Sequence, residues 1–169
     1  MPRKRFAYIR KPKGFNPKFE AVSCYCVLED GRILFLKRSD NDDSEPGKWG
    51  VPTGRKKEYE KSDVETLIRE IREETHMNFE KYRSYFSYSS EFFMRYDKFD
   101  FICRTYVMNL TDEMGLKITL SPEHSRFDWL RLLEAPFALD LVSGLKEILL
   151  KLETRSLIRK IIRKKLIKS

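Results

Sequence analysis

The stretch from Gly54 to Met77 constrains this chain more than any other part of the sequence. Its second half spaces Glu70, Glu73 and Glu74 at i, i+3 and i+4, which predicts three carboxylates on one face of a helix. One face of this helix can therefore carry negative charge while another packs against a core. The apolar positions that form the packing face are Val64, Leu67, Ile68 and Ile71.

The sequence also indicates where this helix begins. Ser62 is followed three residues later by Glu65, which is the spacing of a capping box. Asp63 adds an acid to the first turn, where the helix dipole favours negative charge. We therefore expect the helix to begin at about Ser62.

The three carboxylates allow two interpretations. Acids this close repel one another and raise one another's pKa unless a cation lies among them, and oxygen ligands suit a hard ion such as Mg²⁺ or Mn²⁺. Alternatively they form a solvated acidic face of a surface helix, with Arg69 and Arg72 as local charge partners. The spacing of the acids alone leaves both interpretations open.

The context of the acids resembles the signature of the Nudix hydrolases, G-x5-E-x7-R-E-U-x-E-E-x-G-U, in which U is an aliphatic residue. The chain departs from this signature at two places. Eight residues instead of seven separate Glu60 from Arg69, and we assign the extra residue to the loop before the helix. His76 occupies the glycine position, where a left-handed backbone is usual. The residues that match in order are Gly54, Glu60, Arg69, Glu70, Ile71, Glu73, Glu74 and Met77.

The resemblance implies a fold of the α/β (α+β) class, an αβα sandwich with a mixed central sheet. We divide the chain into an irregular basic arm at 1–18, a Nudix domain at 19–153 and a basic amphipathic C-terminal helix at 154–169. Within the domain, apolar positions across 132–153 predict an amphipathic helix that covers the sheet.

Strand signals precede and follow the acidic helix. The turn signal Asp30-Gly31 lies between two β-rich runs and predicts a hairpin. Two further strands, rich in aromatic residues, are expected on either side of Asp97-Lys98. Cys24, Cys26 and Cys103 lie in these strand-like runs, where we interpret them as small buried residues in a reducing compartment.

The net charge of +8 is unevenly distributed. Residues 1–18 and 154–169 each carry seven Lys or Arg and no acid, and the remaining 20 basic and 26 acidic residues leave 19–153 at −6. Basic termini attract polyanions, so RNA and an anionic membrane are candidate partners. Packing of the last helix on the domain, or a homodimer contact, is the alternative.

We expect a cytoplasmic protein. The sequence has no run of about 18 apolar residues, so no transmembrane segment is predicted. Its first residues are basic but are not followed by the apolar stretch of a secretory signal.

The resemblance implies roles for the acids of the helix and for the loop before it. Glu70 and Glu74 are expected to be the principal metal ligands. Glu73 is expected to be a further ligand or the base that activates water. In the family a backbone carbonyl of the preceding loop joins the metal shell, and Thr53 holds that position here.

Other matched residues are expected to support these ligands. Arg69 would orient Glu70 or its neighbour by a bidentate contact, and Glu60 would support the loop and helix, by a charge pair with an arginine. Gly54 would permit a close approach of the backbone that a β-carbon obstructs. Three cations near the site are candidates for phosphate binding or for solvated surface charge: Lys37, Arg38 and Arg55.

The segment around Glu123 and His124 resembles the E-H-x-x-x-x-W segment that precedes the last helix in many Nudix hydrolases. We expect a loop here that can swing over the metal site. Either residue is a candidate extra ligand or general base, since an imidazole pKa near 6.5 suits neutral pH. The alternative is a loop histidine that packs beside Trp129.

Together these features imply divalent-metal-dependent hydrolysis of a diphosphate bond in a nucleoside diphosphate linked to another group. Nucleoside triphosphates, nucleotide sugars and dinucleoside polyphosphates all fit as nucleotide-like substrates. Two alternatives remain. One is an RNA 5′-end pyrophosphohydrolase, and the other is a catalytically weak Nudix-fold module that binds RNA or an anionic surface through its basic termini.

Overall fold

A computed structural model describes residues 5–96 and 99–152. A helical segment at 145–152 is the last described element. The elements before it are β1 (Arg5–Tyr8), β2 (Pro17–Val27), β3 (Arg32–Arg38), β4 (Trp49–Gly50), β5 (Thr53–Arg55), α1 (Asp63–Thr75), the 3-10 helix η1 (Glu80–Tyr85), β6 (Phe86–Tyr96), β7 (Phe99–Asn109), the 3-10 helix η2 (Asp112–Met114), β8 (His124–Arg131) and α2 (Ala135–Ala138).

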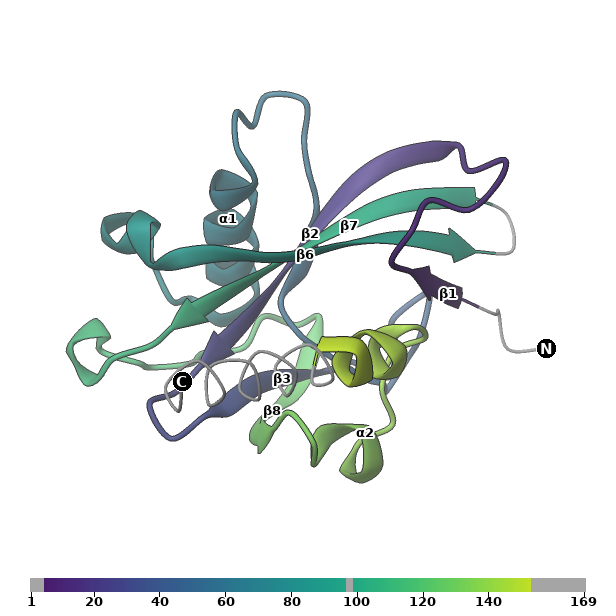
Figure 1. Cartoon of the computed structure of the whole chain (residues 1–169). Helices are drawn as coiled ribbons and strands as arrows, with labels where there is room; N and C mark the ends of the chain where they lie inside the picture. Colours follow the sequence, from purple (N-terminus) through teal and green to yellow (C-terminus); the bar gives the residue numbers. More distant parts are fainter. Residues whose placement is uncertain (1–4, 97–98, 153–169) are drawn as a thin grey trace, which may run out of the picture.

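One mixed sheet lies at the centre of the molecule (Figure 1). Its strands run in the order β1-β6-β7-β2-β3-β4, with β5 also paired to β2 and β8 to β3. The central pair β2 and β7 is parallel, and the other strand pairs are antiparallel. This mixed sheet confirms the predicted fold class.

Helices cover both faces of the sheet. Neighbouring side chains on a strand point to opposite faces, so one strand contributes to a core on each side. On β2, Cys24 and Cys26 are buried in a core cluster that includes Leu67 of α1. Tyr25, between them, belongs to a second cluster that includes Leu149 of the segment 145–152. The αβα arrangement is therefore confirmed (Figure 1), and the cysteines are buried and unpaired, as expected.

The predicted hairpin and the two aromatic-rich strands are confirmed. The turn at Gly31, with φ of 87°, joins β2 to β3, although the two strands pair only at Val27 and Ile33. Most of β3 pairs with β8 instead. Strands β6 and β7 pair over most of their length, while Asp97 and Lys98 lie outside the described residues.

The expectation of an irregular arm was wrong for 5–8. These residues form β1 at the edge of the sheet, where Ala7 pairs with Met94. The backbone N–H of Ala7 also donates to Oε2 of Glu147 at 3.0 Å, and the ammonium of Lys151 donates to its carbonyl. Backbone pairing with β6 outweighs the irregular local sequence because it satisfies polar groups that the arm would otherwise leave to water.

The expectation of one continuous helix over 132–153 was also wrong. Helix α2 ends at Leu139, which has an extended backbone, and Leu141 forms a bridge with Trp49. The N–H of Trp49 donates to Asp140 O at 2.8 Å, and the N–H of Val142 donates to Trp49 O at 2.9 Å. These strand-like bonds replace helical ones, yet apolar residues of this stretch are still buried: Leu141, Leu145, Ile148 and Leu149.

The basic helix predicted at 154–169 lies outside the described residues, as does any contact it makes. Among the residues that are described, the search for a membrane-crossing helix found none of sufficient length and apolarity.

Candidate active site

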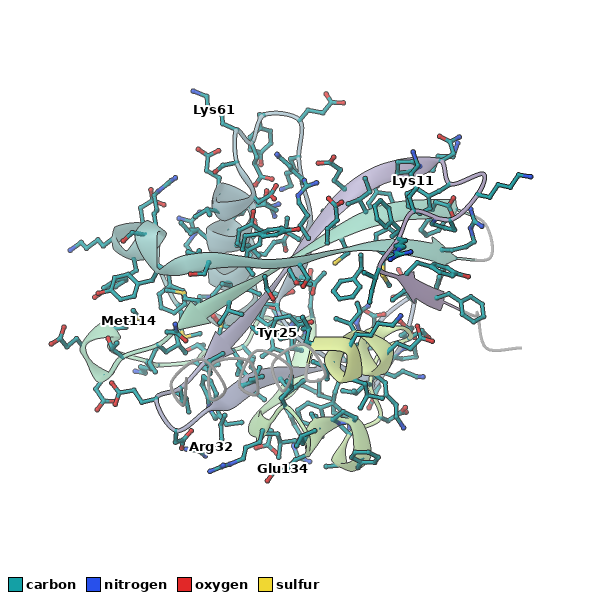
Figure 2. The ribbon with its side chains drawn as sticks, viewed as in Figure 1. Lys11, Tyr25, Arg32, Lys61, Met114 and Glu134 are labelled. Carbon is teal, nitrogen blue, oxygen red and sulfur yellow. The ribbon has the colours of Figure 1, made fainter. Side chains whose placement is uncertain are left out.

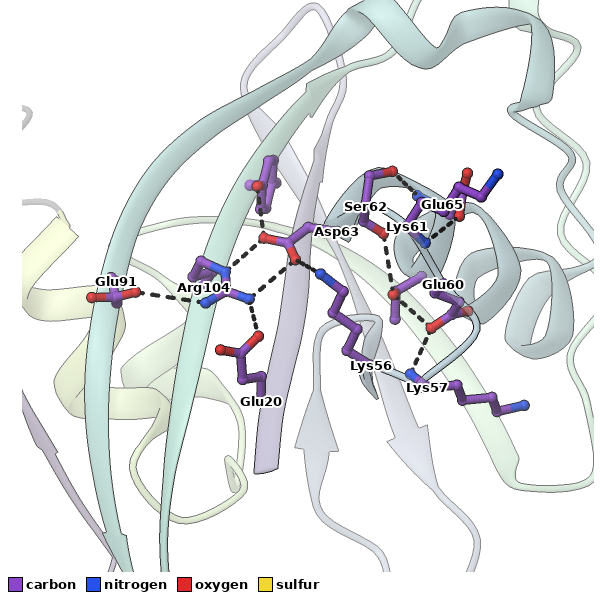
Figure 3. Close-up of polar contacts among 12 residues, drawn as sticks. Glu20, Lys56, Lys57, Glu60, Lys61, Ser62, Asp63, Glu65, Glu91 and Arg104 are labelled. Carbon is purple, nitrogen blue, oxygen red and sulfur yellow. Dashed lines mark hydrogen bonds and ion pairs between the residues drawn. The ribbon is translucent and has the colours of Figure 1, made fainter. Parts of the chain in front are cut away.

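The ends of α1 are fixed by caps on both sides. Ser62 accepts a hydrogen bond from the N–H of Glu65 at 3.2 Å, and the Glu65 carboxylate accepts one from the N–H of Lys61 at 2.8 Å (Figure 3). The predicted start of the helix is therefore confirmed. At the other end His76 adopts the left-handed conformation, with φ of 59° and ψ of 8°.

His76 also connects the end of α1 to a distant segment. Its Nδ1 lies 2.6 Å from the carbonyl oxygen of Thr119. The N–H of Thr119 donates to Thr75 O at 2.9 Å, and the N–H of Ser121 donates to Glu74 O at 3.0 Å. A left-handed non-glycine residue costs roughly 1 kcal/mol, and here its side chain gains a contact that glycine could not make. The segment that leads to Glu123 is thus held against the helix.

Arg69 is the centre of the acid network on α1. Its Nε lies 2.5 Å from Glu60 Oε1 and its Nη2 lies 3.3 Å from Glu60 Oε2, so this pair is bidentate. Nη1 contacts Glu70 at 2.5 Å and Glu73 at 3.1 Å through one oxygen each. The expected contact with Glu70 is therefore present but is not bidentate, because Glu60 occupies the Nε–Nη2 edge of the guanidinium group and leaves Nη1 for Glu70.

Glu60 is buried and fully bonded, as a residue that supports the loop should be. Besides Arg69, it accepts hydrogen bonds from the N–H of Lys57 at 2.8 Å and from the hydroxyl of Thr66 at 2.7 Å. Burial alone would raise the pKa of Glu60, but these hydrogen bonds outweigh burial and lower the pKa to about 2. The carboxylate is therefore charged at neutral pH and ties the loop to α1.

Gly54 is required by the side chain of Glu70. A β-carbon on Gly54 would lie 1.9 Å from Cδ and 2.1 Å from Cγ of Glu70, far inside van der Waals contact. Strand β5 and helix α1 can thus approach closely enough for the Glu70 carboxylate to lie against the backbone at Gly54.

Glu74 is an acid in an environment that disfavours its charge. Its side chain is 8% exposed and its Oε2 has no hydrogen-bond partner. Burial raises the pKa of Glu74 well above its usual value, and the charges of Glu70 and Glu123 raise it further. Burial also raises the pKa of Glu70, against the opposing effect of Arg69. A cation bound between these groups would reverse both shifts.

The carboxylate oxygens of α1 are ligands that suit a hard divalent cation, although the side chains do not surround a common point. Among the residues that the structure describes, no three acidic, histidine or cysteine side chains are gathered closely enough to form a complete metal site. Glu70 and Glu73 are turned toward Arg69, whereas Glu74 has an unpartnered oxygen. Oxygen ligands that carry excess negative charge are the kind that Mg²⁺ and Mn²⁺ take.

Glu123 and His124 lie next to Glu74, but not in a loop free to swing. His124 is the first residue of β8 and pairs with Arg38, while the carbonyl of Glu123 accepts from the N–H of Ser39 at 2.8 Å. The expected mobile loop is therefore wrong, because β3 holds this segment by backbone bonds. Nδ1 of His124 is buried without a hydrogen-bond partner, and burial lowers the pKa of this imidazole, so it is neutral at pH 7.

The three candidate phosphate-binding cations lie in three different surroundings. Arg38 lines a cavity together with Glu74, and its Nη1 donates to both oxygens of Asp42 at 3.1 Å. Lys37, the neighbouring residue on β3, points to the opposite face of the strand. Arg55 lies over the ring of Phe19, 4.0 Å from its centre, and lines the same groove as Glu70.

Two cavities adjoin the acids of α1. The inner recess, of about 100 Å³, is lined by Arg38, Thr53, Glu74, His124 and the buried side chains around Tyr25. The outer groove, of about 780 Å³, lies between the start of β2 and the loop before α1, and Glu60 and Glu70 belong to its lining.

Sequence patterns did not identify several residues of these cavities. The hydroxyl of Tyr25 is buried without a hydrogen-bond partner at the inner recess, within the molecule (Figure 2). No signal distinguished it from an ordinary core residue of a strand. Phe19, Lys57 and Tyr59 line the outer groove. Their proximity depends on the pairing of β2 with β5, which a local pattern does not reveal.

The family model described as the NUDIX domain matches residues 17–152 of the chain. A search of curated proteins found no match. Among solved structures, the MutT protein from Methanosarcina mazei Go1 is 21% identical with a TM-score of 0.68, covering 83% of this chain and 96% of that one. The NUDIX domain of Shewanella oneidensis NrtR, complexed with ADP ribose, is 17% identical with a TM-score of 0.63, covering 88% and 94%. A C. elegans Ap4A hydrolase is 18% identical with a TM-score of 0.57, covering 83% and 98%.

Proposed function

The chain belongs to the Nudix family of pyrophosphohydrolases, and on that premise we propose that it hydrolyses a diphosphate bond in a nucleoside diphosphate linked to a second group. The observation that carries the proposal is the state of Glu74. A carboxylate that is 8% exposed, with one unpartnered oxygen and two acids nearby, is costly to keep unless it binds a cation. A solvated acidic face would not bury this group.

Glu70 and Glu74 are the principal metal ligands in this proposal, with Glu73 as a further ligand or water-activating base. The carbonyl of Thr53 is the backbone ligand. Mg²⁺ or Mn²⁺, when bound, neutralises phosphate oxygens and lowers the pKa of a coordinated water. Arg69 holds Glu70 and Glu73 in place, through contacts of 2.5 and 3.1 Å, and remains charged at neutral pH.

His124 and Glu123 are candidates for the general base beside Glu74. Burial lowers the pKa of the His124 imidazole, so the ring is neutral at pH 7 and one of its nitrogens can accept a proton. Arg38 lines the same recess and supplies positive charge toward a phosphate. Arg38 also forms an ion pair with Asp42, which orients its guanidinium group. Both side chains of this pair are partly buried, with exposed fractions of 30% and 22%.

The substrate is nucleotide-like. A solved neighbour binds ADP ribose and another is named as an Ap4A hydrolase, which supports the diphosphate class in general. Nucleoside triphosphates, nucleotide sugars and dinucleoside polyphosphates contain the required bond.

The test is product release from a panel of these substrates and 5′-triphosphate RNA, with Mg²⁺ or Mn²⁺, for the wild type and Glu74→Gln. We expect activity that EDTA removes and that falls by about 100-fold or more in the variant, the scale of losing one group that stabilises charge in the transition state. Arg72→Gln, an exposed change on the same helix, is the control.

Absence of turnover on every substrate, together with absence of Mg²⁺ binding, would contradict the proposal. It would favour the alternative of a Nudix-fold module that binds RNA or an anionic surface. Turnover of triphosphorylated RNA alone, with a steep dependence on salt, would identify an RNA 5′-end pyrophosphohydrolase instead.

A further inference from the structure

The outer groove is large enough for a nucleotide, whereas the inner recess is not. Sites for small organic ligands commonly measure roughly 300 to 1,000 Å³, and the groove, at about 780 Å³, lies in that range. The inner recess, at about 100 Å³, lies below it. The two cavities meet different acids of α1, because Glu70 lines the groove and Glu74 lines the recess. A substrate held at these acids therefore has room to extend into the groove.

Three of the four acids that line the groove are paired with arginines of the fold. Glu60 and Glu70 bond to Arg69. Glu20 lies 2.5 Å from Arg104, as Figure 3 shows. The fourth acid, Glu58, is exposed and has no ion pair among the described residues, so one unpaired acid stands beside the cations of the groove.

Most cations of the groove are not held in close ion pairs. Lys56 pairs with Asp63 at 3.4 Å. Within the described part of the chain, Lys18, Arg55 and Lys57 have no carboxylate at ion-pair distance, although all three line the groove. Positive charge that is not held in a close ion pair is thus available to a phosphate chain.

An exposed aromatic ring lies beside these cations. Tyr59 is 71% exposed, and the ammonium of Lys57 lies 5.9 Å from the centre of its ring. An exposed ring offers a face on which a nucleobase can stack, and such stacking tolerates any base. Cations and a free ring in one open groove are the elements that recognise a phosphate chain with a base at its end.

We propose that the outer groove binds the part of the substrate beyond the scissile diphosphate, namely a phosphate chain that continues to a second nucleoside. The inference rests on the proposed function, since it places the scissile bond at Glu70 and Glu74. Lys18, Arg55 and Lys57 contact the phosphates, and Tyr59 stacks with the base. A dinucleoside polyphosphate contains this chain, whereas a 5′-triphosphorylated RNA reaches its second nucleoside through a 3′–5′ phosphodiester.

The test measures binding, so that it does not depend on turnover. Methylene-bridged analogues of a dinucleoside tetraphosphate, a nucleoside triphosphate and a 5′-triphosphate trinucleotide RNA are titrated with Mg²⁺ present. The proteins are the wild type, the double variant Lys57→Glu/Tyr59→Ala and Lys117→Glu. The last makes the same charge change at an exposed position outside the groove.

We expect the double variant to bind the dinucleoside analogue, the RNA analogue or both about tenfold more weakly, the scale of losing one stacked base. Its Kd for the triphosphate analogue should rise by a smaller factor, because that ligand loses only the contact of its phosphates with Lys57 and has no second base to stack on Tyr59. Lys117→Glu should leave all three Kd values near the wild-type values. Which analogue responds distinguishes the two sources of the chain.

Equal weakening for all three analogues, or no weakening for any, would overturn the inference. Neither result would touch the proposed function, which is judged by metal-dependent turnover. Conversely, a double variant that loses only the extended analogues would support the groove even in a protein without measurable hydrolysis. Thermal midpoints of the variants within a few degrees of the wild type would exclude misfolding as the cause.

Discussion

At the scale of single residues, the candidate site depends on side chains whose positions are unfavourable without a partner. Glu74 is buried with an unpartnered oxygen, and His76 holds a left-handed backbone. Glu60 shows the opposite case, because Arg69, Lys57 and Thr66 satisfy its carboxylate and lower its pKa. Of these two acids, Glu60 in the loop before α1 supports structure, whereas the charge of Glu74 on α1 lacks compensation within the protein.

Gly54→Ala tests the tightest of these contacts. A methyl group there would lie about 2 Å from the Glu70 carboxyl group, so that side chain must move. We expect kcat/KM to fall by about 100-fold, the scale of a misplacement of about 1 Å at a reacting centre. Gly50→Ala is the matched control, since its added methyl would lie 3.7 Å from Val142, at ordinary contact distance. Equal effects of the two changes would contradict the role given to Gly54.

At the scale of elements, an ion network joins the first turn of α1 to the sheet. Arg104 on β7 donates to Asp63 at 2.6 and 3.2 Å and to Glu20 on β2, and Tyr106 donates to Asp63 at 2.9 Å (Figure 3). The helix that carries the acidic row is therefore fixed at its start by side chains, as His76 fixes its end.

Asp63→Asn tests this network through the pH dependence of stability. Burial would raise the pKa of Asp63, but hydrogen bonds from Arg104 and Tyr106 outweigh it and lower the pKa below its usual value. A lowered pKa in the folded state gives stability that is present above the unfolded value of about 3.9 and lost as pH falls through the folded value.

We therefore expect Asp63→Asn to lower the free energy of unfolding by about 2 kcal/mol between pH 5 and 8, the scale of hydrogen bonds to a charged group. The difference from the wild type should shrink below about pH 4. Urea denaturation at several pH values measures it. A difference as large at pH 3 as at pH 7 would show that charge on Asp63 does not stabilise the fold.

At the scale of the whole molecule, two cores on opposite faces of one sheet hold the site in place. One core includes Leu67 of α1, and the other includes Leu149 of the segment 145–152. The acidic row therefore lies on a helix packed against the sheet, while its neighbours Arg38 and His124 come from β3 and β8. The proposed homodimer and the contacts of the basic termini remain predictions.

Divalent cations should stabilise the whole fold, because a ligand that binds only the native state raises its stability. At a Mg²⁺ concentration about 100 times Kd the gain is roughly 2.7 kcal/mol, which corresponds to a rise of about 5 to 10 °C in Tm for a chain of this size. Calorimetry with Mg²⁺ and with EDTA measures the shift. Glu74→Gln should reduce it, and a full shift in that variant would place the cation elsewhere.

Much of the site's helix is determined by the sequence itself. The start at Ser62, the acidic row and the apolar stripe of α1 depend on residues a few positions apart, whose geometry the helical period fixes. Alternation along β2 likewise put Cys24 and Cys26 on one face. The mixed sheet and the αβα layers came from the resemblance of a motif to a family.

Only the tertiary structure decided which distant groups meet. Strand pairing of β3 with β8 brought His124 beside Arg38, and the bridge between Trp49 and Leu141 interrupted the last helix. The partners of Arg69 and the outer groove likewise depend on how β5, the loop and α1 pack. Local sequence does not fix such contacts, because they are chosen by competition among backbone groups far apart in the chain, all of which must be bonded once buried.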